Sequence, residues 1–597
     1  MGKLLVKPKG KPTGKPPGKR PFKPHSGENG KTFVKSGGKG APKKYLKKTN
    51  DGNFPKKRKF PGKGTGEYRN EQVLRLLYKL YIFKFSGSEA KKPKWDEFKQ
   101  QKKELKQNRQ QIEKKDSYQI VSRAKQVWEI VRRKDCDKEK RIKLMKELQE
   151  LVKGKIKTIA FAHDSTRVLQ CFIQFGDDKQ RQEVFDELKD DMVELSKSKY
   201  ARNIVKKFLM YGSKEQVAGV MVGFKGKVRQ MLRHSEASSV VEYAYNDKAV
   251  LSQRLLLTEE LYGTTFQVFK LITRTTLKKV LEANPDKVNS ILEEMKQILT
   301  PMATKEAVIK HSLVHKVFLD FFLHAPAKQR TEMIESIRES VVYMAHTHDG
   351  ARVAMNCLWH GTPKDRKVII KTMKTYIEKF ATGEYSFLVL LAAFDCIDDT
   401  KLVKQAVLLE ILTSLPDILS NKNGKKVLLY LLSPRDPAHL LPEIIQVLEK
   451  GDGNAHSKKD VALRRKELLE AVSPPLLQHL CDHARTMVMD KASSVTVSEI
   501  LGAAIGDLRP AMEAVAEVAA DDFIPGGVEG QLHMAEHPAG HLVLKWLIEQ
   551  DTKMKETGRE EYESVATEIR EGLKAYTPEL QKIQNCKGVE VLLEKLA

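Results

Sequence analysis

The stretch TRVLQCFIQFG at residues 166–176 decides the fold, because the chain repeats its pattern. It returns as RNIVKKFLMYG at 202–212, and SSVVE at 238–242 follows at the same offset of 36 residues. Apolar residues three and four apart are typical of one face of a helix. A fixed period of this length is the signature of a repeat architecture. The pattern therefore predicts stacked helical units.

Further copies extend the repeat over most of the chain. HKVFL at 315–319, ARVAM at 351–355 and FLVLL at 387–391 again lie 36 residues apart. Weaker copies lie at 425–429, 493–497, 541–545 and 589–593, and an irregular one at 264–268. The irregular copy fills the gap between the third and fourth good copies. We predict an all-α fold, an α-solenoid of about eleven units.

The N-terminal part has a different composition. Residues 1–66 hold 20 Lys/Arg side chains against Glu28 and Asp51, with few apolar residues. Such a segment buries too little apolar surface to offset its ordering entropy, so we expect a disordered basic tail. Its compact cluster is typical of a nuclear localisation signal and comprises Lys56, Lys57, Arg58 and Lys59.

The rest of the chain divides by composition. We assign 67–117 to a basic linker and charged helix, and 118–450 to N-terminal and central repeats. A charged insertion at 451–466 is expected to be a surface loop, and 467–597 to hold the C-terminal repeats. Residues 501–597 carry 10 basic and 18 acidic side chains. We expect this acidic end to stay off nucleic acid and to face a protein partner.

Several functional classes find no support in the sequence. The six cysteines are scattered, which suits a reducing compartment, and no apolar run has the length of a membrane helix. His479, Cys481 and His483 are not expected to converge on a metal, because two residues turn a helix by about 200°. No phosphate-binding loop or nucleophile signature occurs. We expect no cofactor, no metal, no membrane association and no enzymatic activity.

The period of 36 and the core Thr166-Arg167-x-x-Gln170 resemble the Pumilio (PUF) repeat. In that family each unit has three helices, and side chains of the second helix recognise a base, two at its edge and one by stacking. The resemblance implies that Thr166 and Gln170 contact a base edge and that Arg167 stacks.

Other units depart from the family pattern. Ser238 and Glu242 match its guanine-type pair, although Ser239 between them is a poor stacking residue. The fifth positions of later units are apolar, from Leu319 to Leu429, and offer no hydrogen bond to a base. What remains is a basic surface suited to backbone phosphates. The candidate nucleic-acid-binding residues are Thr166, Arg167, Gln170, Arg202, Asn203, Lys206, Ser238, Ser239, Glu242, His315, Lys316, Arg352, Lys425 and Lys426.

The basic tail, the degenerate units and the acidic end resemble a divergent, nucleolar branch of the Pumilio family. That resemblance implies binding of RNA, and of double-stranded DNA, with little sequence preference. It also implies a right-angled, L-shaped array and a role in the nucleolus, with ribosome-assembly proteins, on pre-ribosomal RNA. We expect a monomer. Two alternatives stay open: a sequence-specific repressor of messenger RNA, and a protein-interaction solenoid.

Overall fold

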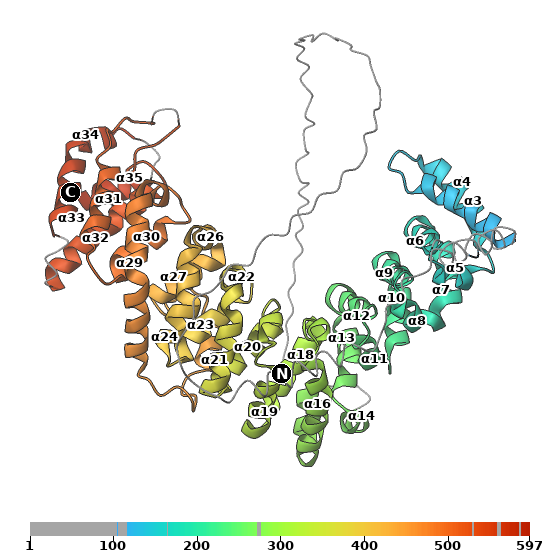
Figure 1. Cartoon of the computed structure of the whole chain (residues 1–597). Coiled ribbons are helices and arrows are strands. Elements are labelled where there is room, and N and C mark those ends of the chain that lie inside the picture. Colours follow the sequence, from blue (N-terminus) through green and yellow to red (C-terminus); the bar gives the residue numbers. More distant parts are fainter. Residues whose placement is uncertain are drawn as a thin grey trace, which may run out of the picture. The chain divides into compact units, whose positions relative to one another are not determined.

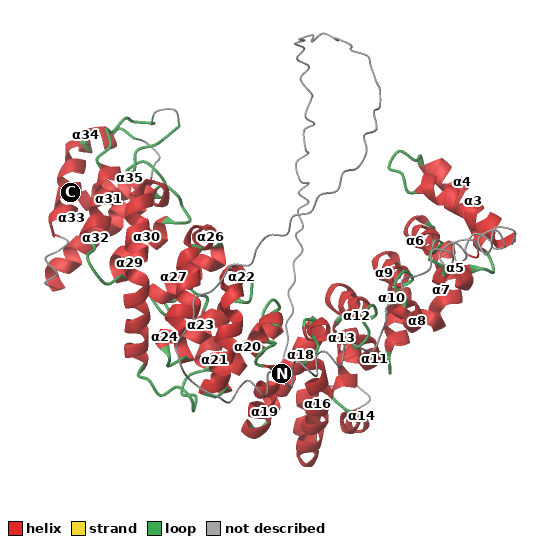
Figure 2. Cartoon of the chain, in the orientation of Figure 1, coloured by secondary structure: helices red, strands yellow, loops and turns green. Residues whose placement is uncertain are grey.

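The computed structural model describes residues 104, 116–163, 165–270, 276–527, 530–557, 563–583 and 587–596. The chain divides into two compact units, Met1–Phe98 and Lys99–Ala597, and the first lies outside the described residues. The predicted basic tail, its localisation cluster and almost all of the linker up to residue 117 also lie outside them. The regular elements of the described residues are helices (Figure 2).

The helices follow one another in chain order as short repeated groups (Figure 1). The first groups contain α3 (Asp116–Val131), α4 (Lys138–Val152), α5 (Ile156–Phe161), α6 (Thr166–Phe175), α7 (Asp178–Leu188), α8 (Met192–Lys197), α9 (Arg202–Tyr211), α10 (Lys214–Phe224), α11 (Val228–Leu232), α12 (Ser238–Tyr243), the π-helix η2 (Ala244–Lys248) and α13 (Leu251–Thr258). The central groups contain η3 (Glu259–Leu261), α14 (Thr264–Phe269), α15 (Leu277–Ala283), α16 (Val288–Ala303), α17 (Glu306–Ile309), α18 (Ser312–His324), α19 (Ala327–Ile337), α20 (His348–His360), α21 (Pro363–Met373), α22 (Ile377–Thr382) and α23 (Phe387–Cys396). The last groups contain α24 (Thr400–Val403), η7 (Lys404–Leu408), α25 (Leu409–Thr413), α26 (Leu415–Ser420), α27 (Lys422–Leu432), α28 (Pro442–Glu449), α29 (Val461–Val488), α30 (Ser494–Ala503), α31 (Arg509–Ala519), α32 (Gly540–Thr557), α33 (Glu563–Ala575), α34 (Thr577–Leu580) and α35 (Lys587–Leu596).

One helix of each group packs against its counterpart in the next group, and together they form what we call the second-helix row. In the described part of the chain the row comprises α3, α6, α9, α12 with η2, α18, α20, α23, α27, α30, α32 and α35. Each repeat copy quoted above therefore lies on this row, except the irregular one. The predicted α-solenoid of about eleven units is confirmed, whereas the right-angled shape stays a prediction.

The irregular copy at 264–268 does not contribute to the row. It forms α14, which packs on α16 and η3, while η2 contacts α18 directly. Two residues donate hydrogen bonds across this junction: Ser312 N–H donates to the Glu242 carboxylate at 2.9 Å, and the Tyr262 hydroxyl donates to Asp320 at 2.7 Å. The eleventh member is instead α3. It lacks the 36-residue step because it is longer than α6 and because the loop that follows it, at 132–137, is longer than the loop at 176–177 after α6.

Helix α6 shows why the repeated stretch folds in this way. Val168, Leu169 and Phe172 are buried, so the apolar face of the helix supplies the core between neighbouring units. The helix ends at Gly176, where an added Cβ would lie 2.6 Å from the carbonyl oxygen of Phe172. Asp177 then caps α7 through a reciprocal pair of hydrogen bonds with Gln180. The same glycine and cap recur one unit later at residues 212 and 213.

The charged insertion forms a shorter loop than predicted, and hydrogen bonds hold it against the array. Residues 451–460 form the loop, and α29 already begins at Val461. The guanidinium of buried Arg366 donates to Asn454 Oδ1 at 2.7 Å, to Ser457 Oγ at 3.0 Å and to the backbone carbonyls around it. Arg464, also buried, donates to Asp398 at 2.7 Å. The loop is therefore held by the helices on either side of it.

Candidate nucleic-acid interface

A pocket of about 350 Å³ opens on the second-helix row where α3, α6 and α9 lie side by side. It contains four of the residues that the sequence predicted to contact nucleic acid. The lining residues are Lys125, Trp128, His163, Thr166, Arg167, Gln170, Tyr200 and Asn203. The structure thus brings Thr166, Arg167 and Gln170 together with Asn203 of the next unit.

The polar side chains of α6 differ in exposure. Arg167 is exposed and Gln170 half-buried, whereas Thr166 is only 2 % exposed. The Thr166 hydroxyl oxygen is buried at the pocket and has no hydrogen-bond partner among the described residues. A buried polar group without a partner costs about 1–3 kcal/mol, so this hydroxyl favours a ligand that supplies one.

Sequence reasoning missed the aromatic part of the pocket. Tyr200 and His163 lie edge to face with their ring centroids 4.2 Å apart, and Trp128 lies on α3 with Arg132 4.9 Å above its ring. Aromatic rings stack on bases with little regard to sequence. Trp128 lies 42 residues before Gln170, outside the 36-residue step, so the repeat alignment did not detect it. Trp128 is half-buried and packs against the core, so its place in the sequence gave no signal that it lines the pocket.

Cationic side chains continue along α9. Arg202 forms an ion pair with Glu236, and the ammonium group of Lys206 lies 5.9 Å from the centre of the Tyr243 ring. Partial burial lowers the pKa of Lys206, and the positive charge of the neighbouring Arg202 lowers it further. A phosphate placed between them would relieve this repulsion.

The third unit does not offer its predicted base contacts to a ligand. Glu242 accepts hydrogen bonds from Ser312 N–H at 2.9 Å and from Ser312 Oγ at 2.6 Å. Ser238 is buried and donates to a backbone carbonyl, and so does Ser239. The reason is the junction with α18, which uses the Glu242 carboxylate as its N-terminal cap. We therefore leave these three residues out of the interface.

His315 also corrects a sequence prediction. Its side chain is fully buried, Nδ1 is 2.6 Å from Thr347 Oγ1, and Nε2 is 2.6 Å from the Ile309 carbonyl oxygen. Burial, with a contribution from His346, lowers the pKa of His315 to about 3. A neutral, internally bonded imidazole belongs to the core of the unit and is not available to a ligand.

The remaining predicted cations are spread over the later row and are partly engaged. Lys316 pairs with Asp320, and Lys425 lies 3.9 Å from Asp490. The Lys426 ammonium group lies 5.6 Å from the centre of the Phe387 ring. Arg352 is half-buried beside His348, and burial lowers its pKa. The structure does not gather these four into one pocket.

Two histidines of α29 lie close together without forming a metal site. The rings of His479 and His483 stack with centroids 4.3 Å apart, so these two side chains do converge, because they lie one helical turn apart. Within the described residues, no group of three metal-ligating side chains exists. Nor does any helix of the described part have the length and apolar character to cross a membrane.

The fold and this surface define a helical-repeat protein with a polar, aromatic and cationic pocket on the row formed by its second helices. The Pumilio-family RNA binding repeat matches residues 165–189 and 191–221, and the CPL (NUC119) domain matches 420–560. Pumilio homolog 3 of Danio rerio is 72% identical, covering 99% of this chain and 97% of that protein. Pumilio homolog 3 of Homo sapiens is 64% identical over 85% of this chain and 84% of that protein.

Solved structures agree with these relatives. The crystal structure of human Puf-A has a TM-score of 0.75 and 64% identity, covering 80% of this chain and all of that one. The crystal structure of human Puf-A in complex with DNA has a TM-score of 0.73 and 63% identity, with the same coverage. The chain belongs to the Pumilio family, in its Puf-A-like branch.

Proposed function

We propose that this chain is a scaffold that binds RNA, and also DNA, mainly through the sugar–phosphate backbone and with little sequence preference. The observation that carries the proposal is the pocket at α3, α6 and α9, where Arg167 and aromatic rings face the same space. Lys206 and Arg202 continue the positive surface along α9. The DNA complex of human Puf-A, a protein 63% identical to this chain, supports the binding of DNA.

Weak sequence preference follows from the chemistry of the row. From α18 to α27, the fifth-position side chains are apolar and buried: Leu319, Met355, Leu391 and Leu429. The carboxylate of Glu242 is occupied by Ser312. Direct recognition of a base requires hydrogen-bonding groups aimed at its edge, with a good bidentate pair contributing about 1–3 kcal/mol in DNA recognition. Within the described residues, the pocket on α6 brings such groups together, so we expect at most a short segment to be recognised by its bases.

The first test removes two charges from the row without disturbing the core. In the Arg167→Ala/Lys206→Ala variant of the full chain, we expect affinity for single-stranded RNA to fall about tenfold, and the salt dependence to become shallower. The matched control is Lys179→Ala/Lys214→Ala, which removes equal charge from exposed positions on α7 and α10. An equal loss in both variants would show that only net charge matters.

For the cellular role, we propose processing of ribosomal RNA and assembly of the large ribosomal subunit in the nucleolus. The resemblance to the nucleolar branch of the family and the basic cluster at 56–59 support this proposal. In cells depleted of the protein, precursors of large-subunit RNA should accumulate. Wild type should restore processing and the Arg167→Ala/Lys206→Ala variant should not. Normal precursor levels after depletion would contradict this role.

A messenger-RNA repressor is the second candidate, favoured by the Thr166–Gln170 pair in the pocket. It predicts a preference of about a hundredfold for one short motif, equivalent to about 2.8 kcal/mol. Replacing Gln170 by Ala should then abolish that preference while leaving affinity for other RNAs unchanged.

A further inference from the structure

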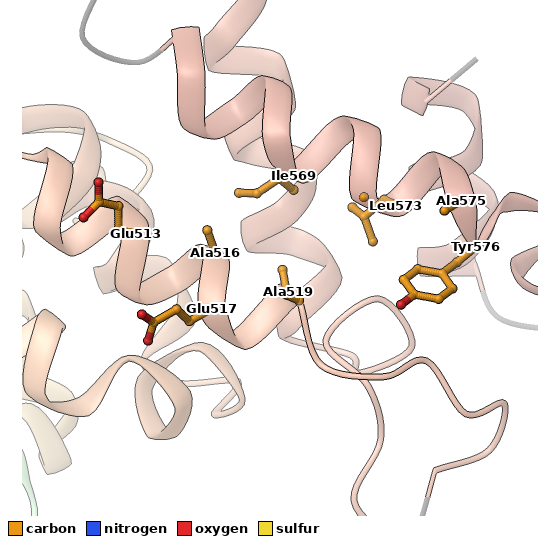
Figure 3. Close-up of a pocket in the computed structure, with 10 residues that line it drawn as sticks. Glu513, Ala516, Glu517, Ala519, Ile569, Leu573, Ala575 and Tyr576 are labelled. Carbon is orange, nitrogen blue, oxygen red and sulfur yellow. The ribbon is translucent and has the colours of Figure 1, made fainter.

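A groove of about 610 Å³ lies between α31 and α33, far along the chain from the nucleic-acid pocket. We call it the α31–α33 groove, and Figure 3 shows its labelled residues on the two helices and just beyond their ends. Its lining residues are Glu513, Ala516, Glu517, Ala519, Ala520, Ile569, Gly572, Leu573, Ala575 and Tyr576. The volume falls within the range of ligand-binding clefts, about 300–1,000 Å³.

The floor of the groove is apolar and built from small residues. Ile569 and Leu573 of α33 are buried beneath it, while Ala516 and Ala520 lie toward α31 and its end. At Gly572 an added Cβ would meet no atom within 4 Å, so the space above this helix is open. Small residues on two adjacent helices allow a third backbone to approach closely.

The rim of the groove is negative. Of its ten lining residues only Glu513 and Glu517 are charged, and both are exposed. Arg509 pairs with Glu513 at 2.9 Å, whereas Glu517 has no ion partner among the described residues. The groove also reaches the C-terminal ends of α31 and α33, where the helix dipoles place partial negative charge.

The surrounding sequence reinforces this field, since residues 501–597 carry 18 acidic and 10 basic side chains. A phosphate backbone would be repelled here. An apolar floor with a negative rim is instead complementary to a peptide whose apolar side chains are flanked by lysine or arginine.

We propose that the α31–α33 groove docks a cationic amphipathic helix of a protein partner. Apolar side chains one turn apart on the partner lie between α31 and α33, and its basic side chains lie beside Glu517, Glu513 and the helix ends. This is the helix-in-groove mode of recognition. The site is separate from the proposed nucleic-acid interface, so the scaffold can hold RNA and a protein at once.

The test uses the full-length chain and a fluorescein-labelled 18-residue helical peptide with leucines on one face and lysines beside them. Fluorescence polarisation measures its affinity, and a second peptide with glutamates in place of the lysines serves as the charge control. Glu513→Lys/Glu517→Lys reverses the rim, and Gly572→Trp fills the groove from an open position. The matched control is Glu590→Lys, an exposed charge reversal on α35 away from the groove.

We expect the cationic peptide to bind wild type and the Glu590→Lys control alike, and about tenfold more weakly to each groove variant. The RNA affinity of all four proteins should be equal, which separates this proposal from the nucleic-acid interface. Equal peptide binding to every variant, no binding to wild type, or equal binding of the anionic peptide would overturn the proposal. Displacement of the peptide by RNA, or a concentration-dependent dimer lost in Gly572→Trp, would assign the groove to another occupant.

Discussion

Replacing Glu242 by Ala tests whether this residue serves the fold or the ligand. Its carboxylate accepts two kinds of hydrogen bond from Ser312, from the backbone N–H and from the hydroxyl, 70 residues along the chain. Without it, the first turn of α18 loses its cap at the junction where η2 meets α18 directly.

The size of the effect follows from these contacts. A hydrogen bond to a charged group contributes about 1.5–3 kcal/mol, and loss of an N-cap costs about 0.5–2 kcal/mol. The two figures describe the same interaction, so they are not added. We expect the variant to lose about 2–3 kcal/mol of local stability in the first turn of α18. Since each 1.4 kcal/mol is a factor of ten, amide exchange in the first turn of α18 should accelerate about 30- to 150-fold.

Hydrogen–deuterium exchange of the full chain, followed by mass spectrometry of peptides covering 312–324, measures this directly. Asp247→Ala, which removes an exposed acid from the neighbouring η2, is the control and should leave exchange unchanged. RNA affinity and sequence preference should be the same in Glu242→Ala as in wild type. Unchanged exchange together with an altered base preference would refute our assignment and restore Glu242 to the interface.

Three further predictions concern stability and binding. Arg366→Met leaves several buried carbonyls without their donor, so we expect a loss of about 3 kcal/mol and rapid trypsin cleavage at Lys458 and Lys459 in the freed loop. His315 stays neutral when folded because its pKa is lowered to about 3, so protonation of the unfolded state should lower stability as pH falls from about 6.5 toward 3. Urea unfolding across this range should show a steeper decline for wild type than for His315→Gln. Trp128→Ala should weaken binding of single-stranded RNA by about 1–3 kcal/mol irrespective of sequence, measured by polarisation on unrelated oligonucleotides.

The repeat spacing predicted the architecture well because each unit reuses one solution to the same packing problem. The buried positions of Val168, Leu169 and Phe172 recur one unit later as Ile204, Val205 and Phe208, and the glycine at the end of α6 recurs with them as Gly212. Such local patterns can be recognised from the sequence alone. The junction at α18 cannot, because it depends on Glu242 meeting Ser312 across 70 residues with α14 displaced from the row.

Site residues were predicted less completely than the fold. The positions of Thr166, Arg167 and Gln170 within their repeat indicated that they share one surface. In the structure they line one pocket, because the second-helix row presents those positions on one side. The same reasoning from repeat position was wrong for His315. Its ring lies in the core because both ring nitrogens have partners there, Thr347 and the Ile309 carbonyl. The aromatic contribution of Trp128 comes from a unit with an irregular step, which only the three-dimensional packing reveals.

Affinity of the full chain for several unrelated RNAs and one DNA duplex, each across a salt series, tests the central claim most directly. Backbone binding predicts similar affinities that fall steeply and in parallel with salt, because each phosphate contact releases counterions. A preference of a hundredfold or more for one short motif, with shallow salt dependence, would contradict the account and favour recognition through bases.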